Sequence, residues 1–291
     1  MKLLFRLLIL VLILSFPICL SSCLSDQDAD DDRLIKIDLD SKQLKKQMQI
    51  LVWLPEMLAE NQDYPVLYFL PDGGGSAHTV IHDYLIGRTA DELVEQGVIE
   101  PMIIVAVSTN RSFCINSAAE VRQIETASGT SFVEGPYEDY LIKEVIPMID
   151  EQFPTKTDRS GRMIGGYSMG GYAALHLAFR NPQLFSRAGG HSASLFPDSF
   201  PDESISDWLY PDELTRDQRD PIRLAQTQDL SGLSIYLDTG QTDVNLEGNA
   251  LLAQVLEDNA IPCVNHIFSG SHGRYYCQAY MSAYLEFYGK P

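Results

Sequence analysis

The chain has 291 residues, 45% of them hydrophobic, which suits one large α/β domain or two small ones and excludes a disordered or collagen-like chain. Its 21 lysines and arginines stand against 40 aspartates and glutamates, a formal net charge of -19 at pH 7. Such a charge repels phosphate backbones and anionic lipid head groups, so we expect no nucleic acid partner.

The N-terminal residues 1–22 have the pattern of a signal peptide. Lys2 and Arg6 precede an apolar stretch, residues 7–20, that is short for a membrane span but typical of a signal-peptide core. The stretch runs into LSSC, which resembles the lipobox of bacterial lipoproteins and predicts lipid attachment at Cys23. The alternative is an ordinary secretory signal followed by a chance cysteine.

Residues 23–33 are the predicted link between this lipid and a folded domain. They contain the acidic run LSDQDADDD, which has too few apolar side chains to pack and suits a solvated spacer. Several acyl chains on Cys23 would anchor the protein stably, because each buried CH₂ adds about 0.8 kcal/mol. We therefore expect a folded domain over residues 34–291 that is exported and held at a bacterial cell membrane or outer membrane by lipid alone.

Three cysteines remain beyond Cys23, and none has the C-x-x-C spacing of a metal or redox site. They are Cys114, Cys263 and Cys277. We therefore expect no metal. A disulfide between Cys263 and Cys277 is permitted in an exported protein, but buried free thiols are the favoured interpretation.

From residue 34 onward, β-like and helix-like runs alternate. The predicted elements are, in chain order, strands at 33–39, 46–55 and 64–71, a helix at 84–97, a strand at 101–109, a helix at 137–153 with a kink at Pro147, a strand at 162–167, a helix at 169–181, a strand at 233–240, a helix at 249–259, a strand at 263–270 and a helix at 274–289. This alternation predicts an α/β fold with a mostly parallel central sheet and helices on both faces.

Residues 192–232 follow neither period. The region contains four prolines and several bulky aromatic side chains. We interpret it as an irregular insertion over the carboxyl edge of the sheet, placed before the strand at 233–240.

The motif GYSMG, residues 166–170, lies between a predicted strand and a predicted helix. It matches G-x-S-x-G, in which a strained turn exposes the serine above the sheet. Small residues two positions either side let the strand and the helix approach each other. Ser168 is therefore the candidate nucleophile, and its weak hydroxyl requires a base that is oriented by an acid.

The candidate base is His272. It lies in SGSHGRYY, a loop of small residues after the last strand, whereas His266 falls inside that strand and suits packing at an edge. The candidate acid should follow the strand at 233–240, which offers Asp238, Asp243 and Glu247. We prefer Asp243, because it lies in a loop that can reach the imidazole, while Asp238 suits a turn cap.

An acyl-transfer site also needs backbone N–H groups that bind the developing oxyanion. Removing one such donor costs roughly 2.7 to 4 kcal/mol in a well-studied protease. Met169 offers an N–H at the start of a helix, and the loop PDGGGS, residues 71–76, offers a second, for which we choose Gly74. A plain flexible loop is the alternative interpretation of these glycines.

Three further side chains are weaker candidates for contact with substrate. Asn110 and Arg111 follow the carboxyl end of a strand, where ligands bind in open sheets, and Arg111 suits a carboxylate or a sugar. A solvated surface arginine is equally compatible with the sequence. His191 follows another strand, and a structural histidine is the favoured interpretation there.

Several of these segments together resemble the esterase-D-like family of α/β-hydrolases. They are VLYFLPDGGGS, FVEGPYEDYLIKEVIPMIDEQF, GRMIGGYSMGGYAALHLAFRNPQLFSRAGGHSAS, YLDTGQTD and GSHGRYY. The resemblance extends from about residue 34 to the end, and it implies an α/β-hydrolase fold, with Ser168 as nucleophile, Asp243 as acid and His272 as base. The family commonly has His-Gly where this chain has Asp72-Gly73, which affects which glycine donates to the oxyanion.

The sequence thus predicts a serine esterase that needs no metal or cofactor. The family that this chain resembles includes S-formylglutathione hydrolases, feruloyl and acetylxylan esterases, siderophore esterases and mycolyltransferases. Together with export, it favours feruloyl or acetyl esters on carbohydrate as substrates. Acyl transfer to a sugar acceptor, or a non-catalytic binding protein on the same fold, are the alternatives, and the oligomeric state is left open.

Overall fold

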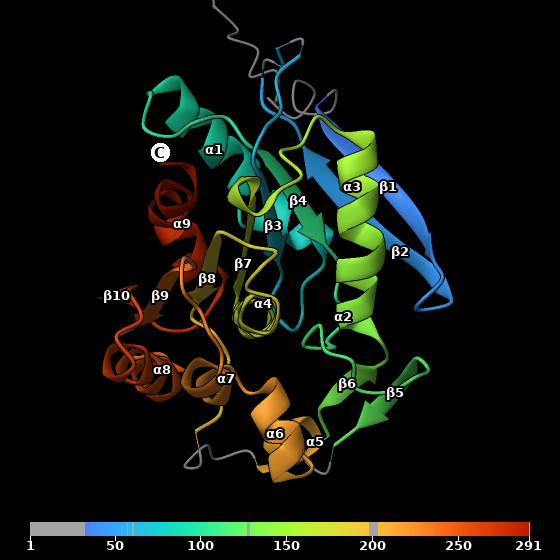
Figure 1. The fold of residues 1–291 in the computed structure, drawn as a ribbon, viewed down its shortest axis with the longest axis vertical. Coiled ribbons are helices and arrows are strands. Elements are labelled where there is room, and N and C mark those ends of the chain that lie inside the picture. The colour runs from blue at the N-terminus through green and yellow to red at the C-terminus, as the bar shows by residue number, and fades with distance from the viewer. Residues whose placement is uncertain (1–32, 57, 60, 127–128, 198–202, 291) are drawn as a thin grey trace, which may run out of the picture.

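The computed structural model describes residues 33–56, 58–59, 61–126, 129–197 and 203–290, and an eight-stranded sheet forms the centre of this part of the chain (Figure 1). In spatial order the strands are β1 (Leu34–Ser41), β2 (Lys46–Trp53), β4 (Ile103–Val107), β3 (Val66–Leu70), β7 (Arg162–Tyr167), β8 (Arg187–His191), β9 (Ser234–Gly240) and β10 (Cys263–Phe268). The strands from β4 to β10 are parallel, and β2 pairs antiparallel with both β1 and β4. The predicted signal peptide, the predicted lipidation site at Cys23 and the predicted spacer up to residue 32 lie outside the described residues.

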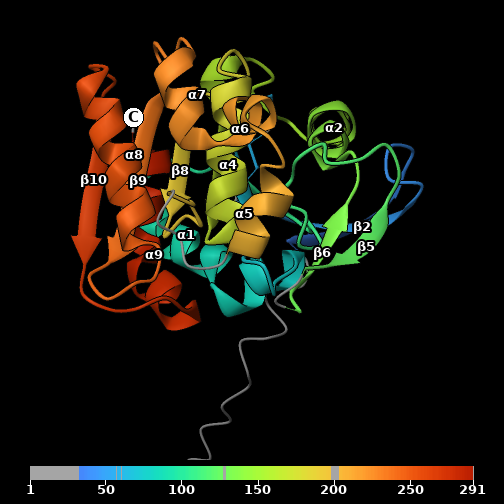
Figure 2. The same cartoon turned by 90° about the horizontal axis from the view of Figure 1, so that it is seen from below.

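Helices cover both faces of this sheet (Figure 2). One face carries α1 (Ile86–Glu95) and α9 (Arg274–Gly289), and the other carries α2 (Tyr137–Tyr140), α3 (Ile146–Gln152), α4 (Met169–Arg180), α7 (Pro221–Thr227) and α8 (Leu246–Asp258). Alternate side chains of a strand point to opposite faces, so Leu67 and Phe69 of β3 pack with α1 and α9, while Tyr68 packs with the other layer. The α/β-hydrolase fold predicted from the sequence is confirmed.

The helical run predicted for residues 137–153 contains a π turn. Leu141–Val145 separates α2 from α3, and Pro147 follows in the first turn of α3. A proline has no N–H to donate to the preceding turn, and π turns often occur where the regular ladder is interrupted. Two further short helical segments are the π turn Thr79–Asp83 and the 3₁₀ turn Arg159–Gly161.

The region after β8 contains short helices where the sequence predicted irregular structure. They are α5 (Glu203–Leu209), α6 (Glu213–Arg219) and α7, each of seven residues. Segments this short show little periodicity, which explains why the sequence predicted irregular structure there. The hydroxyl of Tyr172 on α4 donates to Arg219 O at 2.8 Å, so the end of α6 is attached to α4.

A small hairpin lies beside α5. It consists of β5 (Arg122–Glu125) and β6 (Ser131–Glu134), neither of which was predicted from the sequence. Trp208 of α5 stacks on Phe132 of β6 with ring centroids 4.8 Å apart, and its Nε1 donates to Glu134 at 3.1 Å. The hairpin is thereby fixed to the insertion.

The three cysteines of the described region are free thiols. Cys114 and Cys277 are buried and Cys263 is partly buried, which agrees with the favoured interpretation over a disulfide. Burial raises the pKa of the Cys263 thiol to about 12, so this thiol is protonated at neutral pH. Within the described residues, no helix combines the length and apolar character that crossing a membrane requires.

Candidate active site

Ser168 lies in a sharp turn between β7 and α4. Its φ of +59° and ψ of −117° place a non-glycine residue in a strained conformation, as the G-x-S-x-G motif predicts. The flanking glycines permit the turn: a Cβ on Gly166 would lie 2.3 Å from Gly170 O, and a Cβ on Gly170 would lie 2.2 Å from Leu70 O. The turn after β7, the start of α4 and the end of β3 are therefore too close for any side chain at these two positions.

The structure brings Ser168, His272 and Asp243 together. Ser168 Oγ lies 2.9 Å from His272 Nε2, and His272 Nδ1 lies 3.1 and 3.0 Å from the two carboxylate oxygens of Asp243. The three residues follow the carboxyl ends of β7, β10 and β9, which end at one edge of the sheet. The His272 ring also stacks on Tyr167, with centroids 5.1 Å apart, which orients the imidazole.

The carboxylate of Asp243 has two further donors. The Ser192 hydroxyl donates to Oδ2, and the backbone N–H of Asn245 donates to Oδ1 at 2.8 Å. Burial by itself would raise the pKa of Asp243, but the hydrogen bonds from His272, Ser192 and Asn245 outweigh it and hold that pKa below its ordinary value. Asp243 is thus an anion that can stabilise a positive charge on His272.

The candidate oxyanion donors lie in the first turn of α4 and in the loop after β3. Met169 is the first residue of α4, and the loop packs on it, since a Cβ on Gly73 would lie 2.8 Å from Met169 Cε. The N–H of Gly74, our predicted donor, already donates to Asp72 Oδ1 at 2.7 Å. Among the residues that the structure describes, Gly73 N–H has no hydrogen-bond partner.

Asp72 organises this loop. Its Oδ2 accepts from the hydroxyl of Tyr84 at 2.6 Å, and its own N–H donates to the same hydroxyl at 3.2 Å. The N–H of Gly75 donates to Asp72 O at 3.1 Å. A short aspartate thus closes the turn within the loop, and this contact is the reason that Gly74 N–H is occupied.

His191 is not a substrate contact. It is fully buried, with Nδ1 2.8 Å from Asp238 Oδ1 and Nε2 2.9 Å from the hydroxyl of Tyr288. Asp238 Oδ2 accepts from Tyr276 at 2.8 Å and Tyr284 at 2.9 Å. Asp238 is therefore neither the acid beside His272 nor a turn cap, but the centre of a buried polar cluster behind the site.

This cluster supports the strand ends that carry the candidate site. The N–H of Ser168 donates to His191 O at 2.9 Å, and the N–H of Ser192 donates to Asp238 O at 2.8 Å. Sequence reasoning missed the role of Asp238 because its partners on α9 are tyrosines, which a sequence alone identifies as core residues. Three tyrosines spaced along one helical face were the only available signal.

Asn110 and Arg111 lie beside the loop of residues 73–75. Both are exposed, and both have left-handed backbones, with φ of 51° and 60°. The Nε of Arg111 donates to Gly73 O, which connects this arginine to the candidate oxyanion loop.

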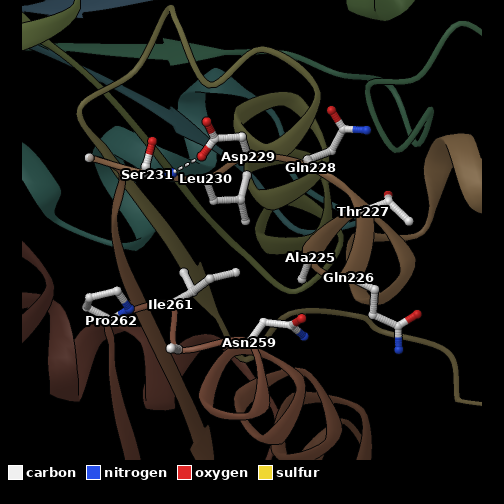
Figure 3. A pocket seen from close by; sticks show the side chains of 12 residues that line it. Ala225, Gln226, Thr227, Gln228, Asp229, Leu230, Ser231, Asn259, Ile261 and Pro262 are labelled. Atoms are coloured by element: carbon white, nitrogen blue, oxygen red, sulfur yellow. Dashed lines mark hydrogen bonds between the residues drawn. The ribbon is translucent and has the colours of Figure 1, made fainter.

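A cavity lies away from Ser168 and from the loop of residues 73–75. It has a volume of about 520 Å³ and is formed by the loop before β9, with Asp229 and Ser231, and the loop before β10, with Asn259 and Ile261 (Figure 3). These loops precede their strands, so this cavity opens at the amino edge of the sheet, opposite Ser168. The described residues contain no cluster of three or more His, Cys, Asp or Glu that could hold a metal ion.

Comparison with known sequences places this chain in a family. A family model described as "Putative esterase" matches residues 41–288. The S-formylglutathione hydrolase of Mus musculus is 25% identical over 269 residues, which cover 86% of this chain and 91% of the relative. An uncharacterized protein of Bacillus subtilis is 26% identical over 261 residues, covering 84% and 93%. An endo-1,4-beta-xylanase/feruloyl esterase of Xylanibacter ruminicola is 28% identical over 153 residues, which cover 52% of this chain and 20% of that protein.

Solved structures show the same fold. A ferulic acid esterase superposes with a TM-score of 0.71 at 23% identity, covering 88% of this chain and 98% of the other. An S-formylglutathione hydrolase from Staphylococcus aureus gives a TM-score of 0.66 at 20% identity, covering 87% and 97%. With the family match over most of its length, the chain belongs to the esterase-D-like family of α/β-hydrolases and is a serine hydrolase that acts on carboxylic ester bonds.

Proposed function

We propose that Ser168, His272 and Asp243 are the catalytic triad of this esterase. The observation that carries the proposal is the continuous chain of contacts from Ser168 Oγ to His272 Nε2 at 2.9 Å, and from His272 Nδ1 to Asp243. His272 takes the proton of Ser168 as the hydroxyl oxygen attacks the ester carbonyl. Asp243 holds the Nδ1–H tautomer and stabilises the imidazolium that forms.

The oxyanion of the tetrahedral intermediate binds to backbone N–H groups at the mouth of the site. Met169 N–H supplies one donor, because it lies in the first turn of α4 and follows the nucleophile. The loop glycines supply the second: Gly73 N–H has no partner among the described residues, and Gly74 N–H becomes available once Asp72 releases it. His272 then protonates the leaving alcohol, and water activated by the same imidazole cleaves the acyl-enzyme.

The proposed substrates are acyl esters on carbohydrate, such as feruloyl or acetyl groups. The similarity to a protein named endo-1,4-beta-xylanase/feruloyl esterase and the fold shared with ferulic acid esterases support this choice. We also propose that the protein is exported and attached through lipid on Cys23, with residues 24–33 as spacer; the apolar N-terminus and the LSSC segment support this.

The catalytic assignment is tested with the purified domain from residue 26. Wild type should hydrolyse 4-nitrophenyl acetate and react with a fluorophosphonate probe at Ser168, as located by peptide mass spectrometry. Ser168→Ala should lose both, by at least a thousandfold in kcat, while its Tm stays near wild type. Wild-type inactivity, or undiminished activity of the variant, would refute the proposal.

Substrate and location need separate experiments. Feruloylated and acetylated oligosaccharides and a thioester, ranked by kcat/KM, test the substrate class, and a thioester preference would contradict it. Adding a sugar acceptor and measuring acylated sugar against free acid separates hydrolysis from acyl transfer. For location, Cys23→Ala should release the protein from the membrane fraction, and an unchanged membrane-bound share would overturn the lipid anchor.

A further inference from the structure

A polar pocket of about 350 Å³ lies next to the candidate oxyanion loop. Its walls are the loop of residues 73–75, the turn with Asn110 and Arg111, and the hairpin residues Gln123 and 131–133. The loop glycines are shared with the catalytic site, because Gly73 packs against Met169. Whatever occupies this pocket therefore lies close to the ester that Ser168 attacks.

Arg111 is the only charged residue among those that line the pocket. Its hydrogen bonds go to backbone carbonyls, from Nε to Gly73 O and from Nη1 to Ser131 O at 3.5 Å. Within the described part of the chain, no carboxylate forms an ion pair with it. Arg159, Arg187 and Arg219 also bond to backbone carbonyls, but unlike them Arg111 is exposed, and it lines this pocket.

The backbone that carries Arg111 is strained. Asn110, Arg111, Phe113 and Cys114 all have φ between 51° and 60°, a region that non-glycine residues rarely adopt. Strain of this kind costs free energy and collects at ligand sites, where surrounding contacts maintain it. Here the buried Phe113 and Cys114 anchor the turn, which directs the guanidinium toward the pocket.

We propose that this pocket binds a carboxylate carried by the ester substrate. The inference rests on the proposed function, because the ligand is part of the molecule that Ser168 cleaves. Nε of Arg111 donates to Gly73 O and Nη1 reaches Ser131 O at 3.5 Å, so Nη2 remains to bind an anion, and Gln123 lines the same pocket. A carboxylate there gives Arg111 the anionic partner that the described chain does not supply.

Binding at this pocket also affects the catalytic loop. Arg111 holds the carbonyl of Gly73, and that carbonyl shares a peptide unit with the N–H of Gly74. An anion that orders the guanidinium therefore also orders this peptide. We expect an anionic ester to gain in kcat/KM over a neutral ester of the same shape.

The test uses two matched pairs of esters. In the first pair the carboxylate is on the acyl part: mono-4-nitrophenyl adipate against its methyl ester. In the second it is on the alcohol part: 4-acetoxybenzoate against its methyl ester. The measured quantity is the ratio of kcat/KM for the anionic ester to kcat/KM for the neutral ester, in wild type, Arg111→Gln, Arg111→Lys and Lys36→Gln.

In at least one pair, Arg111→Gln should lower the ratio about fivefold, the upper end of what an exposed ion pair contributes. Arg111→Lys should retain most of the wild-type ratio. High salt should reduce the wild-type ratio toward that of Arg111→Gln. Lys36→Gln, on the far strand β1, removes the same charge and should leave the ratio unchanged.

The outcomes separate this inference from the proposed function. Activity on the neutral esters that is lost in Ser168→Ala tests catalysis, whatever the ratios are. If the neutral esters are cleaved but the ratio in both pairs is the same in wild type and Arg111→Gln, the carboxylate pocket is refuted while the esterase stands. An equal fall in Lys36→Gln would also refute it, because the effect would then come from overall charge.

Discussion

Replacing Ser192 by alanine tests how the Asp243 carboxylate is held. The hydroxyl of Ser192 donates to Oδ2 of Asp243 in the buried region behind His272, and alanine removes this donor without adding atoms. The variant leaves the His272 and Asn245 hydrogen bonds in place. Ser192 Oγ also lies 3.2 Å from His272 Nδ1, so the variant removes that contact together with the hydrogen bond to the buried carboxylate.

The expected loss follows from the charge of the acceptor. A hydrogen bond to an ionised group is worth about 1.5–3 kcal/mol, so the free energy of unfolding should fall by about 2 kcal/mol at pH 7. Folding lowers the pKa of Asp243, so its contribution is fully present above the unfolded value of about 3.9 and is lost as the pH falls through the folded value. The deficit of Ser192→Ala should accordingly shrink in acid.

The assay is urea unfolding of both proteins from pH 7 down to acid pH. Ser186→Ala is the matched control, because Ser186 lies at the other end of β8 and its hydroxyl donates only to the neutral carbonyls of Ser160 and Arg162. Ser186→Ala should lower the free energy of unfolding by less than Ser192→Ala does, and this loss should not depend on pH. A Ser192→Ala deficit below about 0.5 kcal/mol, or one that stays constant with pH, would show that Ser192 does not stabilise the ionised carboxylate.

Two further predictions concern the backbone and the buried cluster. Gly166→Ala should reduce the free energy of unfolding by at least about 2 kcal/mol and lower kcat, because its Cβ would lie 2.3 Å from Gly170 O; a Tm and kcat equal to wild type would contradict the close approach. Asp238→Asn should cost about 3 kcal/mol in urea unfolding, because it replaces one of the two carboxyl oxygens that face the buried His191 and the tyrosine hydroxyls with an amide NH₂, and a loss below about 1 kcal/mol would count against that network.

The fold and the positions of Ser168, His272 and Asp243 could be predicted because each depends on local signals. The alternating runs predicted the sheet, and the motif glycines predicted the turn at Ser168. At residues 166 and 170 there is no room for a Cβ, so only glycine fits. The preference for Asp243 over Asp238 also agrees with the structure, because only Asp243 contacts His272. Chain order and loop length were sufficient to select three residues that the structure places in contact, and their catalytic roles remain a proposal.

The features that were missed depend on contacts between distant residues. The hydrogen bond from Gly74 N–H to Asp72 depends on the conformation of the loop. Three consecutive glycines allow many conformations, so the sequence does not predict this one. The Asp238 cluster joins β8, β9 and α9, and its members are 46 residues apart between Asp238 and Tyr284. The helices of the insertion have only seven residues each, and α6 is held by a contact with α4. Helices this short depend on tertiary contacts, so the sequence contains no periodic pattern that predicts them.

The C-terminal position of α9 has a consequence for how the enzyme is made. Ser168 and the loop after β3 are synthesised well before Tyr276, Tyr284 and Tyr288. Until α9 docks, the buried Asp238 and His191 lack these hydroxyl partners, and the strand ends beside Ser168 and Ser192 lack the support of the complete cluster. We therefore expect esterase activity to appear only after α9 has packed on the sheet.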